Sequence, residues 1–120
     1  MIDNLFIIAE AGVNHNGSLS VAKEMVRVAK ECGADAIKFQ IFTAIERATE
    51  NHPEWEIFEQ FSLSHNEWET AVTYARKKRI LVYADIFGDE SFEIANAIGV
   101  DGFKIHSEDL LNTFFIEKID

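Results

Sequence analysis

Apolar residues along the chain form two alternating patterns. Short apolar runs of strand length are separated by longer stretches in which apolar residues recur at helical spacing. The short runs predict strands at residues 6–10, 36–41, 80–85 and 101–106. The longer stretches predict helices at residues 19–32, from 64 to about 78, at 91–98, and from Leu110 to the end of the chain.

Capping residues support these boundaries. Ser18 is a candidate N-cap for the first helix, and Gly33 follows it where a C-terminal cap belongs. Ser64 and Glu67 form a capping box at the start of the second helix. Residues 43–63 have no clean period and contain the only proline, so we expect a long loop there with one irregular helical turn at 55–61.

The order of elements predicts an α/β fold. Strands separated by helices pair in parallel through right-handed crossovers. Such a sheet is either an open doubly wound sheet or part of an eight-stranded (β/α)8 barrel, and the strand pattern alone leaves both open. A complete barrel needs about 250 residues. On the barrel interpretation, residues 1–120 form a single domain fragment that contains the first four βα units.

One unit of the sequence occurs twice. The segment Gly33–Gln40 (GADAIKFQ) returns as Gly99–His106 (GVDGFKIH), and each copy carries one lysine near its end, Lys38 and Lys104. A charge inside a buried strand is costly unless it is paired. Two lysines in the same phase therefore suggest one anionic ligand held from two strands. The alternative is that each lysine pairs internally, for instance with Glu10 or Asp85.

Polar side chains gather at the predicted carboxyl ends of the strands, where parallel sheets place their ligand sites. Strand alternation puts Lys38 on one face with Gln40, and Lys104 on one face with His106. Glu10 is either a general acid or base, a group that orients sugar hydroxyls, or a counter-ion of a lysine. The residues at this rim are Glu10, Lys38, Gln40, Asp85, Lys104, His106 and Ser107.

The loop Asn14–Gly17 joins the first strand to the first helix. Asn and Gly are common turn formers, which is one explanation of this segment. The other is that Asn14 and His15 help to bind an anion at the start of the helix. A lone histidine is more often structural than functional. The four histidines show no metal-ligand spacing, so they predict no metal site.

Composition narrows the class of protein. The net charge is −10, with 21 acidic against 11 basic residues, which opposes nucleic-acid binding. No apolar run is long enough to span a bilayer, and residues 1–5 lack the cationic region of a signal peptide. Cys32 is the only cysteine, so no disulfide framework is available. We therefore expect a cytoplasmic protein without nucleic-acid or membrane partners.

Three segments together resemble the sialic acid synthase (N-acetylneuraminate synthase) family. They occur in the family's order and are IAEAGVNHNG at 8–17, GADAIKFQ at 33–40 and FKIHSEDL at 103–110. The resemblance covers essentially the whole chain. It implies that this chain is the first half of a (β/α)8 barrel.

The resemblance also implies an activity in carbohydrate biosynthesis. The family's transferases condense phosphoenolpyruvate with an N-acylated amino sugar such as N-acetylmannosamine, giving a nonulosonic acid and phosphate. A divalent metal, Mn or Mg, is implied as the cofactor, with histidine ligands on later strands outside this chain. We expect residues 1–120 alone to be inactive, and expect as partner either a second copy or the missing half of the barrel.

Individual site residues follow from the motifs. The resemblance implies that Glu10 contacts the sugar and that Lys38, Lys104 and Ser107 bind phosphoenolpyruvate, with Gln40 beside the first lysine. Asn14 and His15 complete the set of candidate substrate contacts.

Two residues depart from the family pattern. Asp85 lies where the family has Ser/Thr-Pro-Phe, and Glu108 replaces a glycine. These carboxylates at the rim oppose an anionic substrate, so a divergent synthase for another nonulosonic acid or an inactive relative would also fit the sequence. Two rival functions stay open: a non-catalytic module derived from the barrel that binds a sugar phosphate or a partner, and a structural α/β domain that self-associates.

Overall fold

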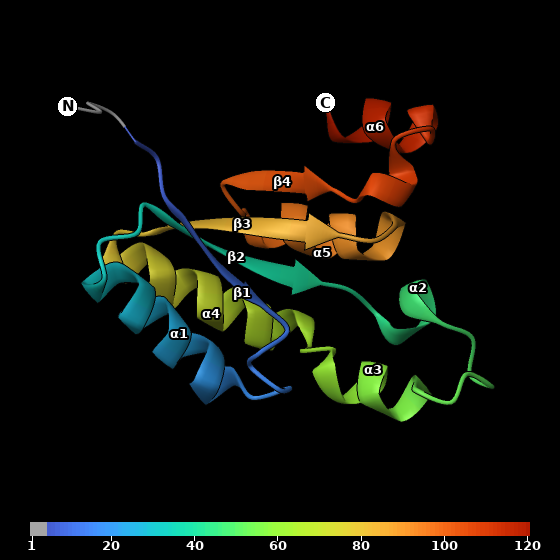
Figure 1. The fold of residues 1–120 in the computed structure, drawn as a ribbon, viewed down its shortest axis with the longest axis horizontal. Helices are drawn as coiled ribbons and strands as arrows, with labels where there is room; N and C mark the ends of the chain where they lie inside the picture. Colours follow the sequence, from blue (N-terminus) through green and yellow to red (C-terminus); the bar gives the residue numbers. More distant parts are fainter. Residues whose placement is uncertain (1–4) are drawn as a thin grey trace.

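The fold is a four-stranded parallel sheet with helices packed on one of its faces (Figure 1). We describe it from a computed structural model of residues 5–120; residues 1–4, which bear on the signal-peptide expectation, lie outside the described part. The strands follow each other across the sheet in the order β1-β2-β3-β4, as the barrel interpretation requires. Their bounds are β1 Ile8–Gly12, β2 Ala36–Ile41, β3 Leu81–Ile86 and β4 Gly102–Ile105.

Helices connect the strands. The bounds are α1 Leu19–Glu31, α2 Ala44–Arg47, α3 Trp55–Phe61, α4 His65–Lys78, α5 Asp89–Ile98, a 3-10 helix η1 at Ser107–Asp109, and α6 Thr113–Ile119. The helices α1, α4 and α5 pack side by side and contact β2 and β3 (Figure 1). Within residues 5–120, none of the helices has the length and apolar content needed to cross a bilayer.

The hydrophobic core lies between the sheet and these helices. Alternate strand residues such as Phe39 and Val82 point toward the helices and are almost fully buried. Trp68 of α4 is 1% exposed and packs against the ring of Phe39 at 5.4 Å between centroids. Burial of apolar area at this interface is the main source of stability. The opposite face of the sheet carries the other set of alternating residues.

Several expected elements differ from the structure, by one residue or more at their ends. β1 begins at Ile8 and runs to Gly12 rather than spanning residues 6–10. Residues 43–63 contain a helix, α2, in addition to the expected turn at 55–61. The last helix starts at Thr113 rather than Leu110, because Asn112 accepts a hydrogen bond from the backbone N–H of Phe115 and caps the helix there.

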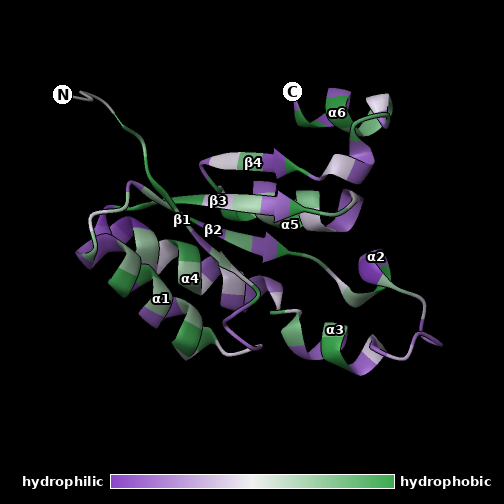
Figure 2. Cartoon of the chain, in the orientation of Figure 1, coloured by the Kyte–Doolittle hydropathy of each residue, from purple (hydrophilic) through white to green (hydrophobic). Residues whose placement is uncertain are grey.

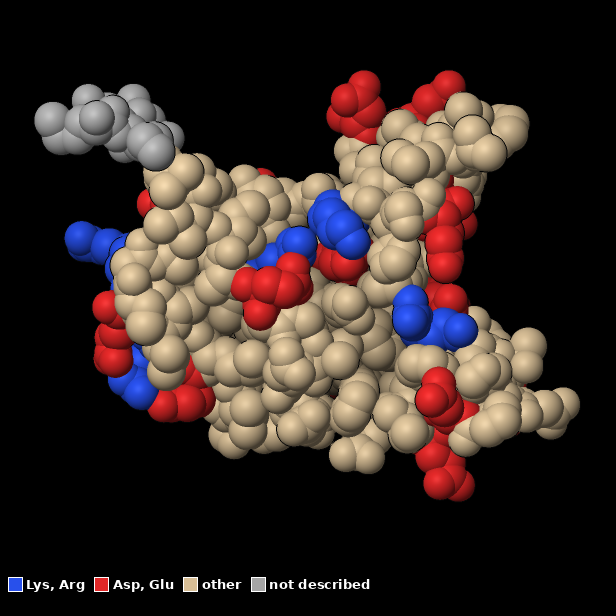
Figure 3. All heavy atoms as spheres, in the orientation of Figure 1, with Lys and Arg blue, Asp and Glu red and all other residues tan. Residues whose placement is uncertain are grey.

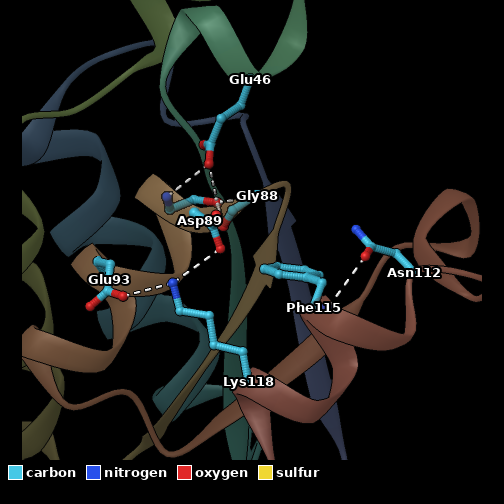
Figure 4. A network of polar contacts seen from close by, with 8 residues as sticks. Glu46, Gly88, Asp89, Glu93, Asn112, Phe115 and Lys118 are labelled. Atoms are coloured by element: carbon cyan, nitrogen blue, oxygen red, sulfur yellow. Dashed lines mark hydrogen bonds and ion pairs between the residues drawn. The ribbon is translucent and has the colours of Figure 1, made fainter.

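A tertiary contact stabilises α2. Glu46 accepts hydrogen bonds from the backbone N–H groups of Ser91 and Thr43, each at 3.0 Å. Figure 4 shows Glu46 beside Gly88, directly before α5. Glu46 thereby joins α2 to the first turn of α5. Lys118 of α6 pairs with two residues of α5, Asp89 at 3.0 Å and Glu93 at 2.8 Å (Figure 4).

Both outer strands of the sheet are bordered by apolar grooves. A groove of about 370 Å³ lies between β1 and α1 and is lined by Met25, Val28 and Ile37, among others. A second groove of about 580 Å³ lies beside β4 and is lined by Phe103, Ile105 and residues of α6. The nearby segment 110–114 exposes Leu111 by 94% and Phe114 by 85%.

Candidate functional site

The polar residues of the strands lie together on the face of the sheet that α1, α4 and α5 leave open. In the strand register, Glu10 lies opposite Lys38, and Lys38 opposite Tyr83. In the next row toward the carboxyl ends, Gln40 lies opposite Asp85 and Asp85 opposite Lys104. Figure 2 shows hydrophilic residues at the carboxyl ends of β2, β3 and β4. The expectation that Lys38 and Lys104 share a face is confirmed.

One glycine gives this face its shape. A Cβ atom at Gly102 would collide with the ring of Tyr83 on the neighbouring strand. The ring of Tyr83 therefore lies against Gly102 of β4. Both residues belong to the row of the strand register that also contains Lys38. Lys104, the second lysine of the repeat, lies two residues after Gly102 on β4.

Lys38 forms an ion pair with Glu10. Its Nζ lies 2.7 Å from Oε2 of Glu10. The Lys38 side chain is only 19% exposed, whereas that of Glu10 is 56% exposed. The other carboxylate oxygen of Glu10 accepts a hydrogen bond from the backbone N–H of Gly12 at 3.1 Å. The pair lies at the β1–β2 side of the open face.

Lys104 forms a second ion pair, with Asp85. Its Nζ lies 2.8 Å from Oδ2 of Asp85. Asp85 is 4% exposed and Lys104 is 43% exposed at the side chain. The other oxygen, Oδ1, is buried and has no hydrogen-bond partner among residues 5–120. Basic and acidic side chains lie next to each other over the middle of this face (Figure 3).

These contacts correspond to the alternative in which each lysine is paired internally. The two lysines share a face, as predicted, but each is neutralised by a carboxylate on the neighbouring strand. An anionic ligand must therefore compete with Glu10 for Lys38 and with Asp85 for Lys104.

Aromatic side chains border the carboxyl ends of the strands. The ring of Phe87, directly after β3, lies 4.7 Å from the ring of His106. The guanidinium of Arg47 lies 4.3 Å from the centroid of Phe87. Arg47 and Gln40 line a small pocket of about 130 Å³. The sequence interpretation missed Arg47, although it is the only Lys or Arg in the acidic segment 43–63.

The loop residues lie apart from the ion pairs. His15 is completely buried against Phe39 and Trp68, on the helix side of the sheet. Its Nδ1 accepts a hydrogen bond from the backbone N–H of Gly17 at 3.1 Å, and Asn14 donates to the carbonyl of Ala11 at 3.1 Å. Burial lowers the pKa of His15 below its usual value, against an opposing effect of nearby Glu67. These contacts favour the structural role for both residues.

The remaining candidates lie after β4. Ser107 and Glu108 are exposed in η1, at the carboxyl end of the strand. For a metal, the described residues offer no group of three or more His, Cys, Asp or Glu side chains with suitable geometry. They do not fit a metal site by themselves, so a metal bound by ligands elsewhere stays a prediction.

Comparisons with known proteins agree on one family. The sequence model of the NeuB family matches residues 25–120. The chain is 36% identical over 126 residues to the N,N'-diacetyllegionaminic acid synthase of Legionella pneumophila, covering 93% of this chain and 35% of that protein. It is also 36% identical to the human N-acetylneuraminate-9-phosphate synthase, covering 94% of this chain and 35% of that protein.

A solved structure has the same fold. The crystal structure of the N-acetylneuraminic acid synthetase of Leptospira borgpetersenii, in complex with citrate, superposes with a TM-score of 0.86 at 35% identity. The alignment covers 96% of this chain and 40% of that one. The chain thus spans about a third of the length of the curated relatives it matches, and its fold is that of the N-terminal half of a synthase barrel. This chain belongs to the NeuB family.

Proposed function

We propose that this chain contributes the first four strands of the catalytic barrel of a nonulosonic acid synthase. The reaction would condense phosphoenolpyruvate with an N-acylated amino sugar of the N-acetylmannosamine type and release phosphate. Membership of the NeuB family and the named activities of the relatives support this class of reaction. The exact amino sugar is left open by these relatives, because their products differ.

The observation that carries the proposal is the placement of Lys38 and Lys104. They lie on one face of the sheet, on strands separated only by β3, in adjacent rows of the register. Phosphoenolpyruvate carries a carboxylate and a phosphate, and each ammonium group has three donors to offer. On binding, the ligand would replace Glu10 and Asp85 as the partners of the lysines. Holding both substrates at one face would supply much of the rate through proximity.

Glu10 is the proposed sugar contact. Its side chain is half exposed on the open face, so its carboxylate is accessible to a ligand. When phosphoenolpyruvate engages Lys38, Glu10 is released to accept a hydrogen bond from a sugar hydroxyl or to transfer a proton. Gln40 lies one row further along the same strand, and Ser107 is exposed at the end of β4. Both are proposed to contact substrate from there.

Calorimetric titration with phosphoenolpyruvate tests the two lysines. Removal of either ammonium group, in Lys38→Ala or Lys104→Ala, should weaken binding to the 120-residue chain by at least about tenfold, the scale of one charge-assisted hydrogen bond. The matched control is Lys77→Ala, on the exposed surface of α4, which removes the same charge and should bind like the unaltered chain. Equal affinity in all four proteins would remove both lysines from the site.

The edge strands β1 and β4 each have a strand neighbour on one side only within the described residues. We propose that β1 and β4, with their apolar grooves, pack against the remaining barrel units or against a second copy of this chain. Sedimentation of the 120-residue chain should then show a dimer or larger assembly. Replacing the exposed Leu111 by Asp should reduce the assembly, whereas Ile45→Asp, on exposed α2 away from both edges, should not. A monomer at all concentrations would contradict self-association.

The second candidate function is a non-catalytic module that binds a sugar phosphate. Its distinguishing feature would be two extra carboxylates directed into the site. Asp85 meets that condition, since it lies buried on the open face. Glu108 lies exposed in η1, so only one of the two carboxylates favours this candidate. Binding of a sugar phosphate without turnover, measured after the other half of the barrel is supplied, would favour the non-catalytic module.

A further inference from the structure

Asp85 has a carboxylate oxygen that the described residues leave without a donor. One oxygen, Oδ2, accepts from Lys104 at 2.8 Å, while Oδ1 is buried and has no partner within residues 5–120. Leaving a buried charged acceptor unsatisfied costs more than a typical hydrogen bond contributes. The oxygen lies on the face of the sheet that carries Lys38 and Gln40. Because this oxygen is buried, a ligand on that face supplies the missing donor only where it displaces the side chains that cover it.

The local charge favours a neutral donor over a cation. The two ion pairs of the open face balance each other, because Glu10 matches Lys38 and Asp85 matches Lys104. A cation at Oδ1 would add an unmatched charge beside the ammonium group of Lys104. A hydroxyl or amide N–H satisfies the oxygen without adding charge. No third metal-ligating side chain lies near enough to form a cluster among the described residues.

A second buried polar atom lies at the same end of the sheet. Nδ1 of His106 has no hydrogen-bond partner among residues 5–120, and the ring of His106 packs against Phe87. This end of the face therefore combines a charged acceptor, an imidazole nitrogen and an aromatic surface. Ligand sites for sugars need such a mixture of apolar contact and a few well-placed polar groups.

We propose that Oδ1 of Asp85 accepts a hydrogen bond from a hydroxyl or the acylamino N–H of the amino-sugar substrate. Asp85 is then a specificity-determining residue of the site, rather than a counter-ion that only neutralises Lys104. The inference rests on the proposed function, since it takes the amino sugar as the ligand. It assigns a role to a residue that departs from the family pattern.

The test is a titration of the 120-residue chain with N-acetylmannosamine, and separately with phosphoenolpyruvate. Asp85→Asn keeps the size of the side chain but replaces a charged acceptor by a neutral amide. Affinity for the amino sugar should fall by at least about tenfold, the scale of a hydrogen bond to a charged group. Affinity for phosphoenolpyruvate should stay equal or rise, because a negative charge beside Lys104 is removed. The control Glu69→Gln, on exposed α4, makes the same charge change and should alter neither affinity.

The outcomes separate this inference from the proposed function. If Asp85→Asn binds the amino sugar as well as the unaltered chain does, the inference is overturned, and the proposed function stands wherever phosphoenolpyruvate binding still depends on Lys38. If the unaltered chain binds neither ligand, both are overturned. Circular dichroism checks the fold of the variant. Should Asp85→Asn fail to fold, Asp85→Thr is titrated in its place. Its affinities for the amino sugar and for phosphoenolpyruvate then decide in the same way.

Discussion

At the scale of single residues, the side of the sheet on which a buried polar group lies separates structural groups from candidate site residues. His15 and Asp85 are both almost inaccessible to solvent. They differ in position, because His15 lies under the helices whereas Asp85 lies on the open face. Strand alternation predicted the second placement from sequence. The placement of His15 under the helices could not be predicted from the sequence, because a residue in a loop does not follow the alternation of the preceding strand.

The buried histidine predicts a dependence of stability on pH. Burial lowers the pKa of His15 in the folded chain below its usual value of about 6.5. In the pH range below that value the unfolded state binds more protons, so the free energy of unfolding should fall as the pH decreases. Urea denaturation at pH 7 and pH 5 measures the loss.

The variant His15→Gln removes this titration. Its unfolding free energy should change less between pH 7 and pH 5 than that of the unaltered chain. The matched control is His65→Gln, at the exposed start of α4, which should keep the full pH dependence. An unchanged dependence in His15→Gln would show that other groups cause it.

At the scale of elements, local sequence signals located the long helices and missed the short one. The Ser64–Glu67 capping box and Gly33 after α1 predicted two helix ends that the structure confirms. α2 has only four residues, too few for a periodic pattern. It is held by Glu46, whose partner Ser91 is 45 residues away in the chain. A contact of that kind is a tertiary effect and leaves no trace in a local pattern.

The Glu46 contact predicts a loss of stability when it is removed. Glu46→Ala leaves the backbone N–H groups of Thr43 and Ser91 without their acceptor. The unfolding free energy should decrease by about 1–3 kcal/mol, measured by chemical denaturation. Glu50→Ala, an exposed glutamate three residues after α2, is the control and should change stability little. Equal stability of the two variants would show that α2 is not held by this contact.

At the scale of the whole molecule, the fold and the place of the site were predictable, whereas the pairing within it was not. Alternation of strands and helices, with the family motifs, predicted a half barrel with its polar residues at the carboxyl ends. The sequence left open whether Lys38 and Lys104 meet a ligand or a carboxylate. The pairing depends on which strands are neighbours, and the register places Glu10 and Asp85 directly beside the lysines, as partners that an anionic ligand must displace.

The central claim is that one anionic ligand is held by both lysines from the same face of the sheet. An NMR titration of the isotopically labelled chain with phosphoenolpyruvate tests it directly. We predict that the backbone amide signals of Lys38 and Lys104 shift together, with one dissociation constant and one ligand per chain. Signals that shift with different constants, or shifts confined to the helix side of the sheet, would contradict the claim.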